Sequence, residues 1–304
     1  MKRLARIIVM ISCALLCTLA KAEKPLRAVI FYQDQTWLQE FNIMRQIAYE
    51  TQSALDGKSE VVISCYGMEA MDIVNSVQAA IDMQADVLLC NGVNSEKCLA
   101  AYEQLSEAGI HLILVDGDDP EIGRLSYVGT DNAQSGAWAL NWILEHCGKD
   151  ACIALLMPSL NTSLCSVGAR ADQFERSAAE QQANIVTKCE TSYDSLEAIR
   201  RIGAMLEEHP EINVLYCTDA VSGKAAATLV QERGLCDKMT VITYDRFEQI
   251  DTYLESGAVD VTLTQNTVAI GKACAEILLR MSEGENGEDV YFECLPVYGN
   301  GAMP

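Results

Sequence analysis

The chain lacks the common signatures of a catalytic or metal site. It contains only three histidines, scattered at His111, His146 and His209, and no Cys-x-x-Cys pair occurs among its 13 cysteines. A structural zinc site needs several such ligands close together, so none is supported. No Gly-x-Ser-x-Gly or His-Glu-x-x-His motif occurs either. The sequence leaves open a pair of carboxylates for glycoside hydrolysis, because the distance between two carboxyl groups depends on the fold. We expect a protein that is not an enzyme and uses no cofactor or metal.

Positive charge is also scarce. Lysine and arginine number 22 against 43 acidic residues, and the net charge is -21 at pH 7. A protein this acidic should repel the phosphates of nucleic acids and the anionic surface of membranes. We therefore expect no nucleic-acid partner.

The N-terminus carries an apolar stretch, residues 7–20, that is too short for a comfortable membrane span. It follows a basic start and precedes an Ala-Lys-Ala sequence that suits signal-peptide cleavage. We therefore predict a signal peptide over residues 1–22 and an exported protein, in the periplasm or at the outer face of the cytoplasmic membrane. An uncleaved anchor and a lipid-modified Cys17 are the alternatives.

Two of the cysteines lie in this segment, which leaves an odd number that cannot all pair internally. Most of the others stand inside apolar runs, where a free cysteine behaves as a small apolar residue. Cys147 and Cys152 flank one helix-to-strand turn, and they are the pair best placed for a disulfide.

Strand-like apolar runs alternate with segments of helical spacing along the chain, in one series before residue 128 and a second after residue 150. Repeated strand-then-helix units predict parallel sheets with helices on both faces. The fold class is therefore α/β, with two doubly wound parallel-sheet lobes. Ligands in such sheets bind beyond the carboxyl ends of the strands.

Between the two series lies the stretch 128–137. A strand-like run ends at Val128, and a helix-like run covers 133–146, with Thr130 or Asp131 placed to cap it. Gly136 lies inside this helix, where it costs about 1 kcal/mol relative to alanine. A helix that accepts this cost usually needs close packing at the glycine.

The residues that follow the expected strands are polar or aromatic. Carboxylates and amides bind hydroxyl groups, and aromatic rings offer flat faces to sugar C–H groups, so these residues predict a site for a polyol. The candidates are Gln35, Trp37, Asn91 and Asp116 in the first series and Tyr193, Thr218, Asp245, Arg246 and Gln265 in the second.

The sequence VGTDNAQSGAWALNWI, residues 128–143, resembles the crossover segment of type I periplasmic sugar-binding proteins, the ribose-binding family. The resemblance extends from about Arg27 to about Tyr298. It implies two lobes joined by a hinge of several crossovers: an N-terminal lobe of residues 23–129 and 266–289, and a C-terminal lobe of residues 130–265 and 290–304.

Family ligand-binding positions match Trp37, Asp116, Tyr193, Thr218-Asp219, Asp245 and Gln265. Two family arginines that hold the sugar have no counterpart, because Gly117 and Gly168 stand there. Arg246 is a hypothetical substitute for one of them. The missing arginines argue against ribose as the ligand. Binding of a ligand between the two lobes is still expected.

The motif Asp116-Gly117-Asp118-Asp119 resembles the start of a calcium loop. Tyr127 stands where a bidentate glutamate is expected, so we interpret the motif as an acidic turn.

The predicted function is an extracytoplasmic solute-binding protein that captures a monosaccharide or related polyol for the membrane permease of an ABC transporter. The first alternative is a sensor partnered with a membrane histidine kinase or chemoreceptor. A secreted α/β enzyme is a second alternative. A sugar-responsive repressor shares the fold, but the acidic charge and the signal sequence argue against it.

Overall fold

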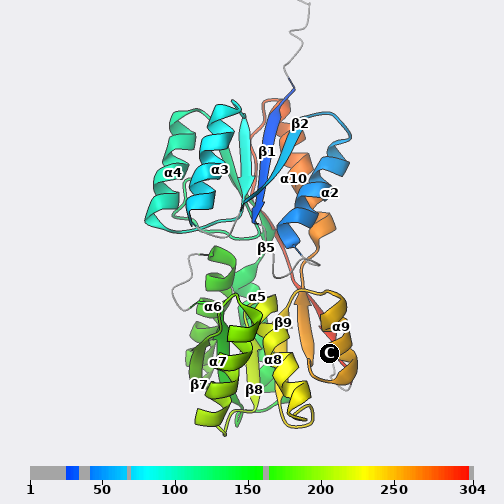
Figure 1. The fold of residues 1–304 in the computed structure, drawn as a ribbon. Helices are drawn as coiled ribbons and strands as arrows, with labels where there is room; N and C mark the ends of the chain where they lie inside the picture. Colours follow the sequence, from blue (N-terminus) through cyan, green and yellow to red (C-terminus); the bar gives the residue numbers. More distant parts are fainter. Residues whose placement is uncertain (1–24, 34–41, 67–69, 160–163, 301–304) are drawn as a thin grey trace, which may run out of the picture.

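The computed structural model describes residues 25–33, 42–66, 70–159 and 164–300. The predicted signal peptide and the candidates Gln35 and Trp37 lie outside these ranges. No helix within them is long and apolar enough to cross a membrane. The chain forms two α/β lobes, one above the other (Figure 1).

The first lobe is built on a six-stranded parallel sheet in the order β11-β5-β4-β3-β1-β2. Its strands are β1 (Arg27–Gln33), β2 (Glu60–Tyr66), β3 (Val87–Cys90), β4 (His111–Val115), β5 (Ser126–Thr130) and β11 (Val290–Phe292). Its helices are α2 (Ile43–Leu55), α3 (Ala70–Asp82), α4 (Glu96–Glu107) and α10 (Thr267–Ser282).

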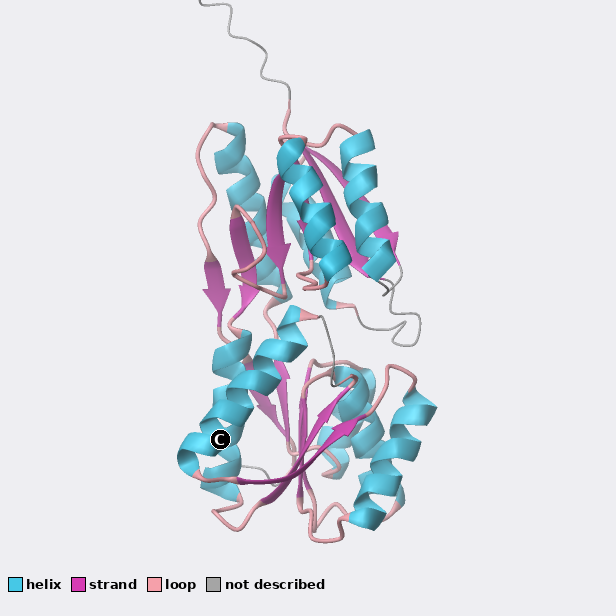
Figure 2. Cartoon of the chain, turned by 90° about the vertical axis from the view of Figure 1, so that its left-hand side faces the viewer, coloured by secondary structure: helices cyan, strands magenta, loops and turns pink. Residues whose placement is uncertain are grey.

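Alternating side chains of each strand enter different cores, as the pleat of a strand requires. Val29 and Leu88 pack with α3 and α4 on one face, whereas Ile30 and Leu89 pack with α2 and α10 on the other. Figure 2 shows the sheets between their layers of helices.

The second lobe repeats the arrangement with the order β12-β10-β9-β8-β6-β7. Its strands are β6 (Cys152–Met157), β7 (Asn184–Glu190), β8 (Val214–Cys217), β9 (Thr240–Tyr244), β10 (Val261–Thr264) and β12 (Leu295–Tyr298). Its helices are α5 (Asn132–His146), α6 (Cys165–Gln181), α7 (Ser195–Glu208), α8 (Ala220–Glu232) and α9 (Glu248–Ser256). All strand pairs are parallel except β10 with β12.

The two orders correspond strand by strand, so β4 and β9 hold equivalent positions in their sheets. The chain passes between the lobes after β5, after β10 and after β11. The segment 290–298 contains two strands in two sheets, β11 in the first lobe and β12 in the second. We therefore propose that the last lobe boundary lies beyond Phe292 and not at residue 290; the remaining boundaries stay predictions.

The expected disulfide between Cys147 and Cys152 is not formed, because both thiols are free. Each has its own polar neighbour: Cys147 donates to Thr240 Oγ1, and Cys152 Sγ accepts from Asn184 Nδ2. Ten cysteines of the described ranges are free, and five of these are buried.

Helix α5 begins as the sequence predicts, since Asp131 caps it by accepting from the amide of Gln134 at 2.9 Å. The close packing expected at Gly136 is confirmed. A Cβ added there would overlap the backbone carbonyl of Arg170, so α5 and α6 approach each other at this point.

We expect Gly136→Ala to destabilise the protein by about 1–3 kcal/mol, because the overlap forces the two helices apart. The matched control is Gly168→Ala in α6, where an added Cβ meets nothing within 4 Å. That variant should gain up to about 1 kcal/mol from helix propensity. Urea unfolding of both measures the difference, and equal stabilities would contradict the packing described.

Candidate functional site

The carboxyl ends of the strands in the two sheets face each other, and the lobes touch there. The amide of Cys165, at the start of α6, donates to the carbonyl of Gly92 beyond β3 at 3.2 Å, and Val93 and Leu164 form an antiparallel bridge. Residues that follow β3, β4, β8 and β9 therefore lie near the boundary between the lobes.

Asp116 follows β4 and Asp245 follows β9, so the two carboxylates occupy equivalent positions. Both have left-handed backbones, with φ of 66° and 67°. Their amides donate to the neighbouring strand, Asp116 to Val128 O and Asp245 to Leu263 O. Non-glycine residues in strained conformations cluster at ligand sites, where the side chain must be aimed.

Asp116 is only 8% exposed and accepts from Asn91 Nδ2 at 2.8 Å through Oδ2. Its other oxygen, Oδ1, and Asn91 Oδ1 are buried without a hydrogen-bond partner among the described residues. A buried acceptor left unpaired costs roughly 1–3 kcal/mol. Two such oxygens, on side chains that are hydrogen-bonded to each other, indicate a place where a ligand donates hydrogen bonds.

Asp245 is joined to the hinge. Gln265 Nε2 donates to Asp245 Oδ1 at 3.1 Å, and Gln265 Oε1 accepts from Thr130 Oγ1 at 2.7 Å. Thr130 ends β5 and Gln265 follows β10, so these bonds link two of the three crossovers to the carboxylate. The position of Asp245 therefore depends on how the lobes are arranged.

Arg170 is the buried cation of the region, 3% exposed. Its Nε donates to Asn132 Oδ1 at 2.8 Å and one terminal nitrogen to Thr218 O at 3.0 Å, while its guanidinium lies 4.0 Å from the centre of the Tyr244 ring. Asn132 Nδ2 in turn donates to Asp116 O. Arg170 thus ties α6, β8 and β9 to the start of α5.

Sequence reasoning assigned no site role to Arg170, Asn132 or Thr130. The signal for Arg170 was present, because it shares a helix face with Val167, Ala171 and Phe174, which are all buried. An arginine among apolar residues at helical spacing must have partners inside the protein.

Burial raises the pKa of Asp116, and the charge of Arg170 opposes the rise. Burial likewise raises the pKa of Asp245 to about 6, against the effects of Arg170 and Gln265. Water would solvate these carboxylates better than the protein does, so each is favoured in its protonated form relative to a free side chain.

We expect the stability difference between the wild-type chain and Asp245→Asn to depend on pH. The pKa of Asp245 is higher in the folded than in the unfolded chain, so the folded chain binds more protons between about pH 4 and pH 6. Asp245 therefore contributes fully to the free energy of unfolding below about pH 4. This contribution falls by up to about 3 kcal/mol as the pH rises to about 6. Urea unfolding of both chains across this range measures it. A wild-type chain that becomes more stable relative to Asp245→Asn as the pH rises would contradict the raised pKa of this carboxylate.

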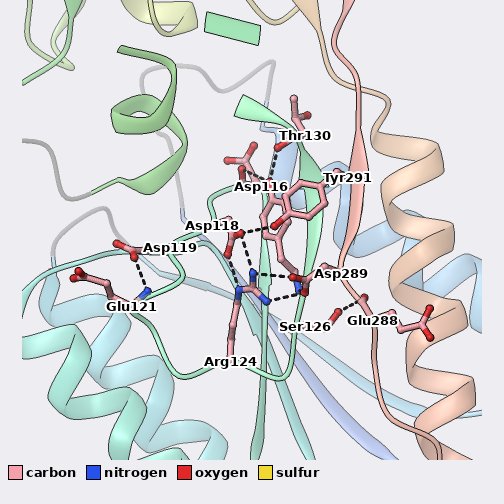
Figure 3. Close-up of polar contacts among 11 residues, drawn as sticks. Asp116, Asp118, Asp119, Glu121, Arg124, Ser126, Thr130, Glu288, Asp289 and Tyr291 are labelled. Atoms are coloured by element: carbon pink, nitrogen blue, oxygen red, sulfur yellow. Dashed lines mark hydrogen bonds and ion pairs between the residues drawn. The ribbon is translucent and has the colours of Figure 1, made fainter. Parts of the chain in front are cut away.

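The loop after Asp116 is braced by an ion-pair network (Figure 3). Arg124 bonds both oxygens of Asp118 and also reaches Asp289, and Tyr291 donates to Asp118 at 2.8 Å. The acidic residues of this turn are therefore joined to β5 and β11, which fixes the backbone that carries Asp116. No metal-binding group of three or more such ligands occurs in the described ranges.

The structure brings together Asn91, Asp116, Thr218, Asp245 and Gln265 through these contacts. Tyr193 follows β7 and packs against the hydrophobic cluster beneath α7 and α8. Arg246 is half exposed and pairs with Asp251 at 2.6 Å. Its suggested substitution for a family arginine stays a hypothesis, and Arg170 is the arginine that lies beside Asn132 and Tyr244.

A separate pocket of about 440 Å³ lies between α5 and the segment 293–296, lined by Gln134, Trp138, Glu293 and Leu295 among others. It lies beside the last crossover, and its lining also includes Ser135 and Cys294. It is therefore a second candidate place for a small molecule.

Comparison with known proteins gives one family match, to the family described as Periplasmic binding protein domain, over residues 28–286. Ribose import binding protein RbsB of Salmonella typhimurium is 22% identical over 235 residues, 77% of this chain and 78% of the relative. The glucose-galactose binding protein GanP of Geobacillus stearothermophilus superposes with a TM-score of 0.83 at 18% identity, over 91% of this chain and 99% of that one. XylFII in the XylFII-LytSN complex superposes with a TM-score of 0.79 at 19% identity, over 90% and 98%.

Proposed function

Because the chain belongs to the periplasmic binding protein domain family, we propose that it is an extracytoplasmic solute-binding protein for a monosaccharide or related polyol. The family membership confirms the resemblance drawn from the sequence, and the structural matches confirm the α/β fold with two parallel-sheet lobes. It also identifies a binding protein and not an enzyme.

One observation supports the proposed ligand class, a monosaccharide or related polyol. Two equivalent carboxylates, Asp116 and Asp245, stand at the facing edges of the two sheets, and Asp116 has a buried oxygen without a partner. A hydrogen bond from a ligand hydroxyl to a carboxylate contributes roughly 1.5–3 kcal/mol. The ribose and glucose-galactose specificities stated in the names of RbsB and GanP fit such a ligand.

In this proposal Asp116 and Asn91 bind the ligand from one lobe, and Thr218, Asp245 and Gln265 bind it from the other and from the hinge. Gln35, Trp37, Tyr193 and Arg246 remain predicted contributors. Closure of the two lobes around the ligand follows the hinge motion typical of two-domain binding proteins. Export and delivery of the closed complex to a membrane permease of an ABC transporter complete the proposed role.

The second candidate is a ligand sensor that reports to a membrane histidine kinase or chemoreceptor. It is favoured by one observation, that the similar chain XylFII is solved in a complex with a second protein, LytSN. Both roles use the same ligand site, so they differ in the partner that recognises the closed state.

Thermal unfolding of residues 23–304 against sugars, polyols, sugar phosphates and nucleosides tests the proposal. A ligand at about 100 times its dissociation constant stabilises by about 2.7 kcal/mol, which shifts the midpoint by several degrees. We expect such a shift with a sugar or polyol that is recovered unchanged. Consumption of the compound, or no shift with any sugar or polyol, would contradict it.

A further inference from the structure

The buried carboxylates at the boundary between the lobes have no ion-pair partner. Asp116 and Asp219 are buried and Asp245 is partly buried, and none of the three takes part in an ion pair among the described residues. Asp219 is compensated locally, since it caps α8 by accepting from the amides of Val221 and Ser222 and from the Ser222 hydroxyl. Asp116 and Asp245 are less fully compensated, since Asp116 accepts from the side-chain amide of Asn91 and Asp245 from that of Gln265, and Oδ1 of Asp116 accepts no such bond.

Arg170 does not supply the missing cation in full. Its hydrogen bonds among the described residues go to an amide oxygen and a backbone carbonyl, and its flat face lies on Tyr244. It acts on Asp116 and Asp245 through space only, and one positive charge faces two carboxylates. When both are ionised, this buried region carries a net negative charge, which is costly away from water.

Among the described residues, Arg170 is the cation whose charge acts on both Asp116 and Asp245. Arg246, which directly follows Asp245, is half exposed and held by Asp251. The segments 34–41 and 160–163, which follow β1 and β6 in sequence, contain no lysine or arginine, and the first contains two acidic residues. A cation carried by the ligand would therefore compensate the excess negative charge of the ionised carboxylates.

We propose that the preferred ligand is a polyol that bears an ammonium group, such as an amino sugar, with its ammonium group bound by Asp116 Oδ1 and its hydroxyls by Asp245 and Asn91. This inference rests on the proposed function and narrows its ligand class. It follows from an unpaired buried carboxylate oxygen in a region with excess negative charge. The same charge excess excludes sugar phosphates and uronic acids, because a ligand carboxylate or phosphate would meet Asp116 and Asp245 without a facing cation.

Isothermal titration with matched pairs tests the inference: glucose with glucosamine, galactose with galactosamine, and sorbitol with N-methylglucamine, with glucuronate as the anionic member. We expect at least one amine to bind about 10-fold or more tightly than its hydroxyl parent, equivalent to about 1.4 kcal/mol. If every parent that binds does so at least as tightly as its amine, or if glucuronate binds more tightly than the amines, the inference is overturned and the proposed function stays intact. No binding by any sugar or polyol would overturn both.

The pH dependence gives an independent readout. Asp116, which binds the ammonium group in this proposal, interacts with Asn91, Tyr127, Ser166, Arg170, Asp245, Gln265 and Cys294. An ammonium ligand needs ionised carboxylates, so its affinity should rise as the pH increases from about 5 to about 7, while that of the neutral parent should not. An affinity for the amine that is constant or falls over this range would overturn the proposed contact.

Asp116→Asn removes the charge and keeps the shape, so it should reduce the preference for the amine over its parent about 10-fold or more. Asp260→Asn is the matched control, because Asp260 is a largely buried carboxylate at the opposite edge of the second sheet, bonded to the amide of Val241. In Asp260→Asn the ratio of the affinity for the amine to the affinity for its hydroxyl parent should equal the wild-type ratio. An unchanged ratio in Asp116→Asn would overturn the inference. If that variant fails to fold by circular dichroism, the pH dependence of the wild-type preference for the amine over its parent provides the test.

Discussion

Asp245→Ala is expected to abolish ligand binding, with an affinity loss of about 100-fold or more, while the chain stays folded. The carboxylate is buried at the edge of the second sheet and is aimed by Gln265. Loss of one or two hydrogen bonds to a charged acceptor, at roughly 1.5–3 kcal/mol each, accounts for this magnitude. Titration of the ligand found by thermal unfolding measures it.

The left-handed backbone at Asp245 requires a second variant. Alanine at φ of 67° is strained, whereas asparagine tolerates this conformation. Asp245→Asn should therefore lose binding with less loss of stability than Asp245→Ala. Asp260→Asn should bind as the wild type does, and an unchanged affinity in Asp245→Asn would remove Asp245 from the site.

Arg170→Met is expected to destabilise the protein by about 3–5 kcal/mol, the range found when one partner of a buried charge network is removed. In this variant Asn132 Oδ1 and Thr218 O lose their hydrogen-bond donor. Asp116 and Asp245 also lose the buried positive charge that favours their ionised forms. The side-chain volume stays similar, so the loss is mainly electrostatic. Urea unfolding near neutral pH measures it.

Arg246→Met is the matched control for that substitution. It breaks the half-exposed pair with Asp251, and exposed ion pairs contribute at most about 1 kcal/mol. Equal effects of the two substitutions would contradict the buried role of Arg170.

The sequence could predict much of the fold, because strand-length apolar runs and helical spacing are local properties. It located Asp116, Asp245, Asn91 and Gln265, since residues after parallel strands meet at one edge of a sheet. It could not divide the segment 290–298 between two sheets, because pairing partners are distant in sequence.

Side-chain partners were harder to predict for the same reason. The short spacing of Cys147 and Cys152 favoured a disulfide, but each thiol has a distant neighbour instead, Thr240 and Asn184. Arg170 lies far in sequence from Thr218 and Tyr244, and only the packing of α6 on the second sheet brings them together. Local patterns therefore indicate the position of a candidate site. They do not indicate which charged side chains from distant parts of the sequence lie beside it.

A crystal structure with a ligand selected by thermal unfolding tests the central claim most directly. The account predicts the ligand between the lobes, with its donors within about 2.6–3.2 Å of carboxylate oxygens of both Asp116 and Asp245. A ligand found instead in the pocket between α5 and the segment 293–296, with both carboxylates uncontacted, would contradict it.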